Sequence, residues 1–408
     1  KRQGTSGASV GLASSQSGIS YQLFVGSTAS GTAIAGTGDA ISFGSRTQEG
    51  GYTVKATDMV NGCISNMPGS VAISALPLPD FQTMNGGGSY CAGGTGRAVG
   101  LAGSQTGVNY TLYRGTMAVG TAVEGTGSGI TFGMQTVPGT YSVVATNNTT
   151  GCVRNMAGTT QIAIDALPAD QSIIASASSY CAGGNGVALS LGGSQAGVVY
   201  TIMNGTTTGS TVIGTGSPIS FGNQTAAGTY TVRAVNSTTG CAADMTGSAS
   251  ISINPLPAPY SVTGGGAFCA GGSGVPVGLS LSENGVNYTL RSGLTAVAGP
   301  VSGTGDAISF GVINTAGTYN VVAVNATTGC SRNMAGTANV AINQLPSVVN
   351  VTGGGSYCEG GNGVHVGISG STANVAYQLY KDGTATGLPL SGTGSALDFG
   401  LFEGAGVY

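Results

Sequence analysis

The sequence contains no tryptophan, a single histidine and few charges, since Lys, Arg, Asp and Glu together make up 6% of its 408 residues. Soluble globular domains carry about 25% charged residues. The formal net charge of −3 argues against nucleic acid as a partner, because phosphate binding needs a concentrated face of Lys and Arg. No apolar run approaches ~18 uninterrupted residues, so we expect no membrane-spanning helix in this segment.

Glycine is abundant instead, with 76 residues, and hydrophobic residues still make up 40% of the chain. This composition is typical neither of disorder nor of collagen. An internal repeat explains it. The tripeptide Gly-Thr-Gly recurs so that each copy starts 89 residues after the previous one, at Gly36, Gly125, Gly214, Gly303 and Gly392.

The period predicts five tandem domains. A Leu-Pro pair recurs at the boundary between one copy and the next, as at Leu76-Pro77 and Leu167-Pro168. Proline interrupts strand pairing because it lacks an N–H. We therefore expect short, stiff junctions, and a first and a last copy that are incomplete. The predicted domains, called repeats 1 to 5 below, are residues 1–77, 78–168, 169–257, 258–346 and 347–408.

Within a repeat the hydrophobic residues alternate as they do in strands. Val275, Val277 and Leu279 alternate with small or polar residues, and residues 286–290, 307–310, 319–324 and 338–342 are also predicted strands. About seven short strands separated by turn residues indicate an antiparallel sandwich. No window has a helical period.

The segment Gly228-Thr229-Tyr230-x-Val232 resembles the entry to strand F of immunoglobulin-like domains, where a tyrosine precedes the inward-facing cysteine of antibodies by two residues. Val232 stands at that cysteine position here, and the usual tryptophan is missing. The predicted fold class is therefore all-β, a tandem array of immunoglobulin-like antiparallel β-sandwich domains. A methionine in each of the first four repeats, such as Met156, is predicted to fill the core.

Catalytic and metal centres are not predicted. His365 occurs in one repeat only, at a position that Ala98, Val187 and Pro276 occupy elsewhere. Catalytic and metal centres need several titratable groups that converge, and the acidic residues do not recur in register. We predict that the chain is not an enzyme, with no catalytic residue, no metal site and no cofactor.

The eight cysteines give about two per repeat, and none forms a Cys-x-x-Cys pair of the kind found in zinc sites. We predict structural disulfides and hence an extracellular location. Pairing within a repeat is favoured. The six cysteines of this pairing form Cys91–Cys152, Cys181–Cys241 and Cys269–Cys330.

Pairing across each junction is the alternative, and its four bridges are Cys63–Cys91, Cys152–Cys181, Cys241–Cys269 and Cys330–Cys358. It uses every cysteine, but it requires sites that a sandwich should hold far apart. Within-repeat pairing leaves Cys63 opposite Arg2, which stands where the other repeats have a cysteine. This replacement puts the disulfide of the first repeat in doubt.

The segments 86–96, 139–147 and 151–156 resemble the immunoglobulin-like tandem repeats of giant cell-surface proteins of Bacteroidota. The resemblance covers nearly the whole chain. It implies type IX secretion and a surface adhesin or fibre of the kind linked with gliding motility.

The predicted function is a structural extracellular stalk or filament, with sister copies as lateral partners. The alternative is a module that binds carbohydrate or protein through its end loops. Similarity between the turns Ser104-Gln105-Thr106-Gly107 and Ser194-Gln195-Ala196-Gly197 weakens this alternative, because binding loops should differ between copies.

Overall fold

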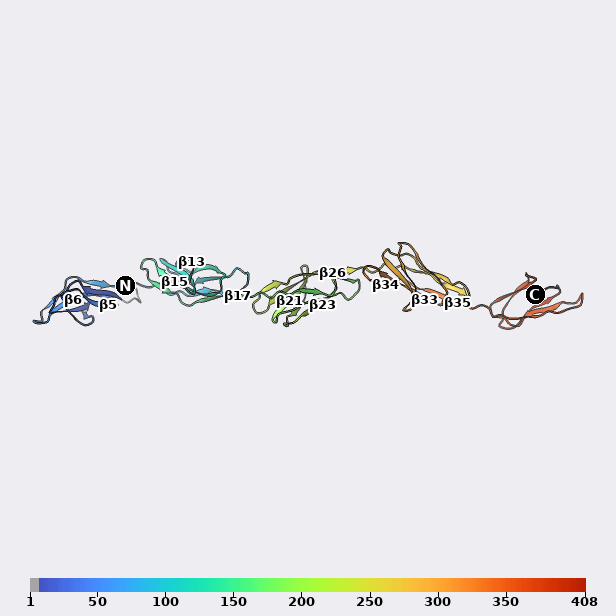
Figure 1. Cartoon of the computed structure of the whole chain (residues 1–408), viewed down its shortest axis with the longest axis horizontal. Helices are drawn as coiled ribbons and strands as arrows, with labels where there is room; N and C mark the ends of the chain where they lie inside the picture. The colour runs from blue at the N-terminus through green and yellow to red at the C-terminus, as the bar shows by residue number, and fades with distance from the viewer. Residues whose placement is uncertain (1–6) are drawn as a thin grey trace. The chain divides into compact units, whose positions relative to one another are not determined.

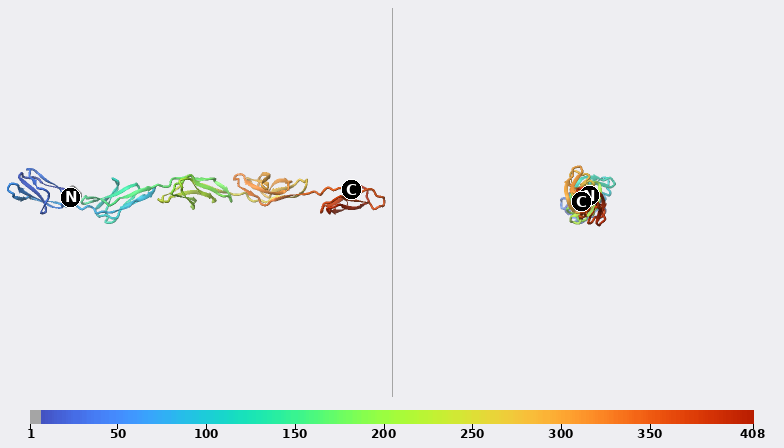
Figure 2. Two further views of the ribbon diagram at one scale, coloured as in Figure 1. Left: turned by 90° about the horizontal axis from the view of Figure 1, so that it is seen from below. Right: turned by 90° about the vertical axis from the view of Figure 1, so that its right-hand side faces the viewer.

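Strands, turns and loops make up the described chain. The computed structural model describes residues 7–408, and no helix occurs in that range (Figures 1 and 2). Two compact units divide the chain. The first is Lys1–Ser176 with Ala188–Asn223 and Gly228–Ser250, and the second is Ala177–Val187 with Gln224–Ala227 and Ile251–Tyr408. Repeats 2 and 4 each lie inside one unit. The boundaries predicted at the Leu-Pro pairs stay a prediction.

The strands follow one another at the spacing of the sequence repeat. Repeat 1 contains β1 (Ala8–Leu12), β2 (Ile19–Val25), β3 (Thr28–Ala29), β4 (Ile34–Ala35), β5 (Ile41–Arg46), β6 (Gly50–Asp58), β7 (Ile64–Asn66) and β8 (Val71–Ile73). Repeat 2 contains β9 (Met84–Gly86), β10 (Gly88–Cys91), β11 (Arg97–Leu101), β12 (Val108–Arg114), β13 (Met117–Glu124), β14 (Ile130–Gln135), β15 (Gly139–Asn147), β16 (Val153–Asn155) and β17 (Thr160–Asp165). Repeat 3 contains β18 (Ile173–Ala175), β19 (Ser179–Cys181), β20 (Val187–Leu191), β21 (Val198–Asn204), β22 (Thr207–Ile213), β23 (Ile219–Gln224), β24 (Gly228–Asn236), β25 (Ala242–Asp244) and β26 (Ala249–Asn254). Repeat 4 contains β27 (Val262–Gly264), β28 (Gly266–Cys269), β29 (Val275–Leu279), β30 (Val286–Ser292), β31 (Thr295–Ser302), β32 (Ile308–Ile313), β33 (Gly317–Asn325), β34 (Ser331–Asn333) and β35 (Ala338–Asn343). Repeat 5 contains β36 (Val351–Gly353), β37 (Val364–Ile368), β38 (Ala376–Lys381), β39 (Thr384–Ser391) and β40 (Leu397–Phe402).

Repeat 2 is a sandwich of two sheets. One sheet has the order β14-β11-β9, and the other has the order β10-β17-β15-β12-β13 with β16 also paired to β15. Strand β10 runs parallel to β17, whereas β12 is antiparallel to β13 and β15. In immunoglobulin nomenclature these sheets are A-B-E and A′-G-F-C-C′. This order places the repeat among immunoglobulin-like sandwiches.

Repeats 3 and 4 use the same pairings, and repeats 1 and 5 contain part of them. Repeat 4 has the orders β27-β29-β32 and β28-β35-β33-β30-β31, with β34 beside β33. In repeat 3, β21 pairs with β22 and β24 in the first unit, and β19 pairs in parallel with β26 in the second unit. Repeat 1 has the order β3-β2-β6-β7 and a β1-β5 pair, and repeat 5 has the orders β36-β37-β40 and β38-β39.

In repeats 1, 2 and 4 the core lies between the two sheets of the same repeat. In repeat 2, Tyr110 and Leu112 of β12 face Leu101 of β11, and all three side chains are fully buried. Their polar neighbours on β12 point outward, as strand alternation requires. Burying a side chain of this size stabilises the fold by ~1.5–3 kcal/mol. Separate clusters in repeats 1 and 4 confirm that single repeats have cores of their own.

The tyrosine expected at the start of strand F is present and hydrogen-bonded. The Tyr141 hydroxyl donates to the Val137 carbonyl oxygen at 2.7 Å, and Tyr52 and Tyr319 make the same contact four residues upstream. This contact is the tyrosine corner of immunoglobulin-like domains. Val143 follows in the cysteine position and is buried. The buried Met156 confirms that this methionine fills the core.

Strand E forms an edge of the smaller sheet, because strand D is missing. The edge is bent in repeat 2 by a bulge, where the register between β11 and β14 shifts from Ala98 to Gly100. Gly133 of β14 has a φ of +79°, and its N–H bonds to the Thr131 hydroxyl oxygen at 3.1 Å. The bulge shortens the stretch of flat edge that another strand could join.

Candidate functional site at the repeat junctions

The first junction lies against the loops of the repeat that follows it. Arg154 of β16 donates from Nη1 to the Pro79 carbonyl oxygen at 2.8 Å. The Asp80 N–H donates to Gln105 Oε1 at 2.6 Å, and Gln105 Nε2 donates to the Asp80 carboxylate. Proline carbonyls can accept but proline nitrogens cannot donate. Arg154 therefore supplies the donor to the Pro79 carbonyl, whereas Gln105 both accepts from Asp80 and donates to it.

Arg154 also lies over the ring of Phe81, with its guanidinium carbon 4.2 Å from the ring centroid. Phe81 is 64% exposed, so this cation–π contact is worth about 0.5–1 kcal/mol. One arginine thus contacts both the backbone and a side chain of the junction.

The second and third junctions repeat these contacts with register-equivalent residues. The Ala169 N–H donates to Gln195 Oε1 at 2.6 Å, and the Ala258 N–H donates to Glu283 Oε1 at 3.2 Å. Arg332 Nη1 donates to the Pro257 carbonyl oxygen at 2.9 Å. A glutamine or glutamate after strand B is therefore a junction-binding residue that the sequence analysis did not identify.

Repeat 3 has no arginine at the position of Arg154. At its junction an acidic residue, Asp170, makes a contact in addition to that of Gln195. Asp170 accepts from the Thr246 N–H at 2.7 Å and from the Thr246 hydroxyl at 2.6 Å. These hydrogen bonds, the hydroxyl first, hold the pKa of the Asp170 carboxyl below its ordinary value.

The loop that presents Gln105 is built on a buried tyrosine. The Gln105 N–H donates to the Tyr110 hydroxyl oxygen at 2.9 Å. Ser104 Oγ accepts from the Thr126 N–H at 2.9 Å and donates to the Ser128 carbonyl oxygen. The loop after strand B is thereby tied to the Gly-Thr-Gly segment, and we call this arrangement the Tyr-Gly knot.

Close packing explains the first glycine of each Gly-Thr-Gly. A Cβ on Gly125 would overlap the Gln105 carbonyl oxygen and lie 3.0 Å from Cε2 of Tyr110. The same tyrosine occurs in repeat 4, where Tyr288 accepts from the Glu283 N–H at 2.9 Å. Burial raises the pKa of the Tyr288 hydroxyl.

Two disulfides connect neighbouring repeats. Cys91 of β10 pairs with Cys241, and Cys181 of β19 pairs with Cys330, each with the Cα atoms 5.5 Å apart. The favoured within-repeat pairing is therefore wrong for Cys91–Cys152, Cys181–Cys241 and Cys269–Cys330, and the alternative across each junction is also wrong. Each bridge instead joins the first cysteine of one repeat to the second cysteine of the next.

The parallel A′ and G strands explain this outcome. Cys91 lies beside Asp165 at the end of β17, whereas Cys152 directly precedes β16 at the start of strand G. About 13 residues of strand separate the two ends, which is ~40 Å at strand rise. Disulfides bridge Cα atoms less than ~7 Å apart. The two cysteines of one repeat therefore lie at opposite ends of its sandwich.

The remaining four cysteines are free in the described range, with Cys152 buried and Cys63, Cys269 and Cys358 exposed. Cys152 Sγ lies 3.8 Å from the Leu76 carbonyl oxygen, much as Cys241 Sγ lies 4.0 Å from the Asp165 carbonyl oxygen. By register the partner of Cys152 is position 2. Arg2, and the doubt it raised, lie outside the described residues.

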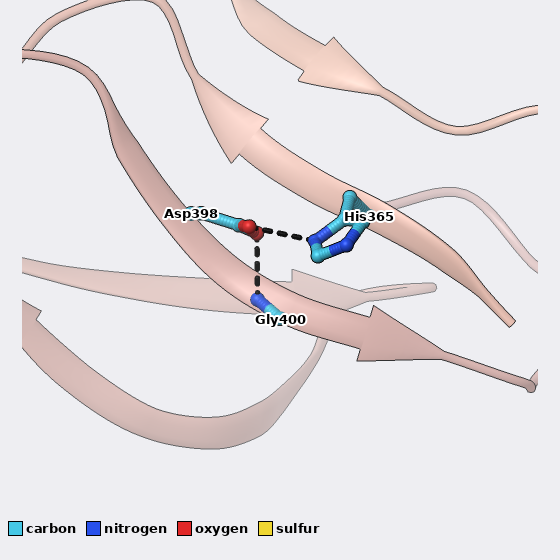
Figure 3. A network of polar contacts seen from close by, with 3 residues as sticks. All are labelled: His365, Asp398 and Gly400. Carbon is cyan, nitrogen blue, oxygen red and sulfur yellow. Dashed lines mark hydrogen bonds and ion pairs between the residues drawn. The ribbon is translucent and has the colours of Figure 1, made fainter. Parts of the chain in front are cut away.

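His365 has an acidic partner that the sequence analysis did not find. Its Nδ1 lies 2.6 Å from Asp398 Oδ2, and Asp398 Oδ1 accepts from the Gly400 N–H at 2.8 Å (Figure 3). The histidine is on β37 and the aspartate on the paired strand β40. Both side chains are more than half exposed, and surface pairs of this kind contribute about 0–1 kcal/mol.

Asp398 takes the turn position that Ser309 occupies in repeat 4, where the serine hydroxyl oxygen accepts from the Gly311 N–H. The aspartate is thus a turn residue with a histidine opposite. Across residues 7–408, no group of three or more His, Cys, Asp or Glu side chains is arranged to hold a metal ion. Within the same range, the structure contains no helix suited to crossing a membrane.

No protein-family model and no curated protein matches the chain. Solved structures with tandem immunoglobulin or fibronectin modules align at low identity. The ICAM-5 D1–D4 ectodomain fragment is 12% identical, with 79% of this chain and 92% of that chain covered and a TM-score of 0.32. The eight N-terminal immunoglobulin domains of Down Syndrome Cell Adhesion Molecule are 14% identical, with 94% and 60% covered and a TM-score of 0.26.

The fibronectin(III)-like modules of Clostridium thermocellum CbhA are also 14% identical, with 42% of this chain and 95% of those modules covered and a TM-score of 0.27. Alignments with TM-scores this low carry no argument about function. The immunoglobulin-like assignment rests on the strand order and the tyrosine corner. The names of these proteins do not indicate Bacteroidota or type IX secretion.

Proposed function

We propose that the chain is a structural stalk or filament segment of a large bacterial surface adhesin or fibre, exported by the type IX system. The observation that carries this proposal is the pair of disulfides between successive repeats, Cys91–Cys241 and Cys181–Cys330. A protein that only needed stable separate domains would place its bridges inside them. Bridges between domains restrict how neighbours move, which is what a stalk requires.

The junction contacts support the same conclusion. Hydrogen bonds to charged groups contribute about 1.5–3 kcal/mol each, and Arg154 and Arg332 each donate one to a junction proline carbonyl. A Gly/Ser linker would have no such anchors and would behave as a flexible coil. Disulfides also persist in oxidising surroundings, which supports an extracellular location at the cell surface.

The end loops that a binding module would use are engaged by the preceding junction. Gln105 and Gln195, which follow strand B, both bind junction N–H groups. The loops that a carbohydrate or a protein would contact are thus already occupied in repeats 2 and 3. Lateral partners in a filament would be sister copies of this chain.

Electron microscopy of the purified oxidised chain tests the proposal. The stalk requires rods with one density for every repeat, and their end-to-end length should vary little between particles. The unchanged chain is compared with the variant Arg154→Ala with Gln105→Ala, which lacks the side chains that bind the first junction. This variant should show a bend confined to the first junction. Compact particles, or equal bending at every junction before and after substitution, would contradict the proposal.

Cellular location is tested separately. Surface labelling of intact cells with a membrane-impermeant thiol reagent should detect the bridged Cys91, Cys181, Cys241 and Cys330 after mild reduction. Labelling that appears only after lysis would place the chain inside the cell and overturn the extracellular stalk.

A further inference from the structure

The two disulfides overlap along the sequence. Cys181 lies between Cys91 and Cys241, and Cys241 lies between Cys181 and Cys330. Bridges confined to single domains would close separate loops. The chain inside each loop could not be extended when the two ends of the protein are pulled apart. Overlapping bridges instead create one covalent network with two nodes, the cystines Cys91–Cys241 and Cys181–Cys330.

Three segments of chain join these two nodes in parallel. Residues 91–181 span 90 peptide steps, residues 181–241 span 60, and residues 241–330 span 89. The shortest segment, which holds β20 to β24 of repeat 3, becomes taut first when the nodes are pulled apart. The other two segments are longer, so they remain slack at that point once their strands have unfolded.

We propose that this network limits how far the chain can be extended. The proposal rests on the stalk function, because a stalk is the kind of protein that is pulled along its length. Unbridged, residues 91–330 would stretch over 239 steps, which is ~860 Å at ~3.6 Å per residue. With both bridges the limit is 60 steps, or ~220 Å. Once unfolded, the segments that hold β11 to β17 of repeat 2 and β27 to β33 of repeat 4 carry no tension when the shortest segment is taut.

The network makes a prediction that separate loops do not. Over the whole chain, the shortest covalent path consists of residues 1–91, 181–241 and 330–408, about 228 steps, or ~820 Å when stretched. Loss of either bridge lengthens this path to about 258 steps. Loss of both bridges gives 407 steps. The second loss therefore releases about five times more chain than the first.

Single-molecule force–extension on the full chain, with handles at both ends, measures these lengths. The background variant carries Cys63→Ser, Cys269→Ser and Cys358→Ser, which removes the exposed thiols. Replacing Cys91 and Cys241, or Cys181 and Cys330, by serine should each add ~110 Å to the fully stretched length, and replacing all four should add ~640 Å. A non-reduced peptide map identifies the bridges in each sample. Stretched length does not depend on whether a variant folds.

Cys152→Ala is the matched control, because Cys152 is a free, buried cysteine. It should leave the stretched length unchanged, whereas pairing with Cys91 would make the same substitution release about 60 residues. Equal and additive increments from the two serine pairs would overturn the network. So would a length that is unaffected by a phosphine reductant, since the reduced chain should match the variant without either bridge.

This measurement separates the network from the stalk. It uses purified oxidised chain, so its outcome does not depend on where the protein resides. Thiol labelling that appears only after lysis would overturn the stalk and leave the measured network intact. Additive increments in a chain labelled on intact cells would overturn the network alone.

Discussion

The substitution Gly36→Ala tests the close packing of the Tyr-Gly knot in repeat 1. The Gly36 N–H donates to the Ile19 carbonyl oxygen at 2.8 Å, and the Gln16 N–H donates to the Tyr21 hydroxyl oxygen at 2.9 Å. A Cβ on Gly36 would overlap the Gln16 carbonyl oxygen and lie 2.9 Å from Cε2 of Tyr21. Backbone and a buried ring would both have to move.

The expected cost combines two effects. Overpacking a buried site costs about 1–3 kcal/mol, and loss of the hydrogen bond to the buried tyrosine costs about 1–3 kcal/mol more. Gly36→Ala should therefore reduce the free energy of opening of repeat 1 by about 2–6 kcal/mol. Each 1.4 kcal/mol corresponds to about a tenfold change in an opening equilibrium.

Native-state hydrogen exchange by mass spectrometry is the suitable assay, because a chain of several domains does not unfold in one step. Peptides covering β2, residues 19–25, should exchange about 30-fold to about 20,000-fold faster. The matched control is Gly51→Ala, since a Cβ on Gly51 meets no atom within 4 Å. Exchange in β2 that is the same in both variants would refute the packing argument.

Three further predictions concern the hydrogen bonds and the cysteines. Tyr141→Phe removes the tyrosine corner and should speed exchange in β15 about 5- to 150-fold, for a loss of ~1–3 kcal/mol; unchanged exchange would show that the hydroxyl is not needed. The pKa of Asp170 is lowered in the folded chain, so its contact with Thr246 should hold at neutral pH and be lost as the pH falls through that folded pKa. The protection of the Thr246 amide, measured as its exchange rate relative to the intrinsic rate at the same pH, should then decrease in acid, and Asp170→Asn should abolish the change. Arg2→Cys should introduce a disulfide with Cys152, because the separation of 150 equals that of Cys91–Cys241; a non-reduced peptide map that still shows a free Cys152 would contradict the register rule.

Local patterns predicted most of the sandwich. The predicted strands 286–290 and 338–342 lie in β30 and β35, because apolar alternation is a local property. The strand β31 (Thr295–Ser302) was not predicted, since it contains Gly299 and Pro300. Both residues normally interrupt strands, but an edge strand tolerates proline because half of its N–H groups need no partner in the sheet.

Contacts between residues far apart in the sequence could not be predicted from local patterns. The bridge from Cys91 to Cys241 depends on the parallel pairing of β10 with β17, which places Cys91 at the far end of its sandwich. No local signal gives the direction of that pairing. The contact of His365 with Asp398 likewise depends on the register between β37 and β40, which are separated by two other strands in the sequence.

The bent edge of strand E has a consequence for how such a chain can change in length. Neighbouring repeats of similar sequence are prone to exchange strands while they fold, because any open edge fits its equivalents elsewhere in the chain. The shift near Gly100 and the left-handed Gly133 shorten the flat part of the strand E edge on which this exchange depends. A duplicated copy therefore adds no long flat strand E edge, so the number of repeats can change without creating one.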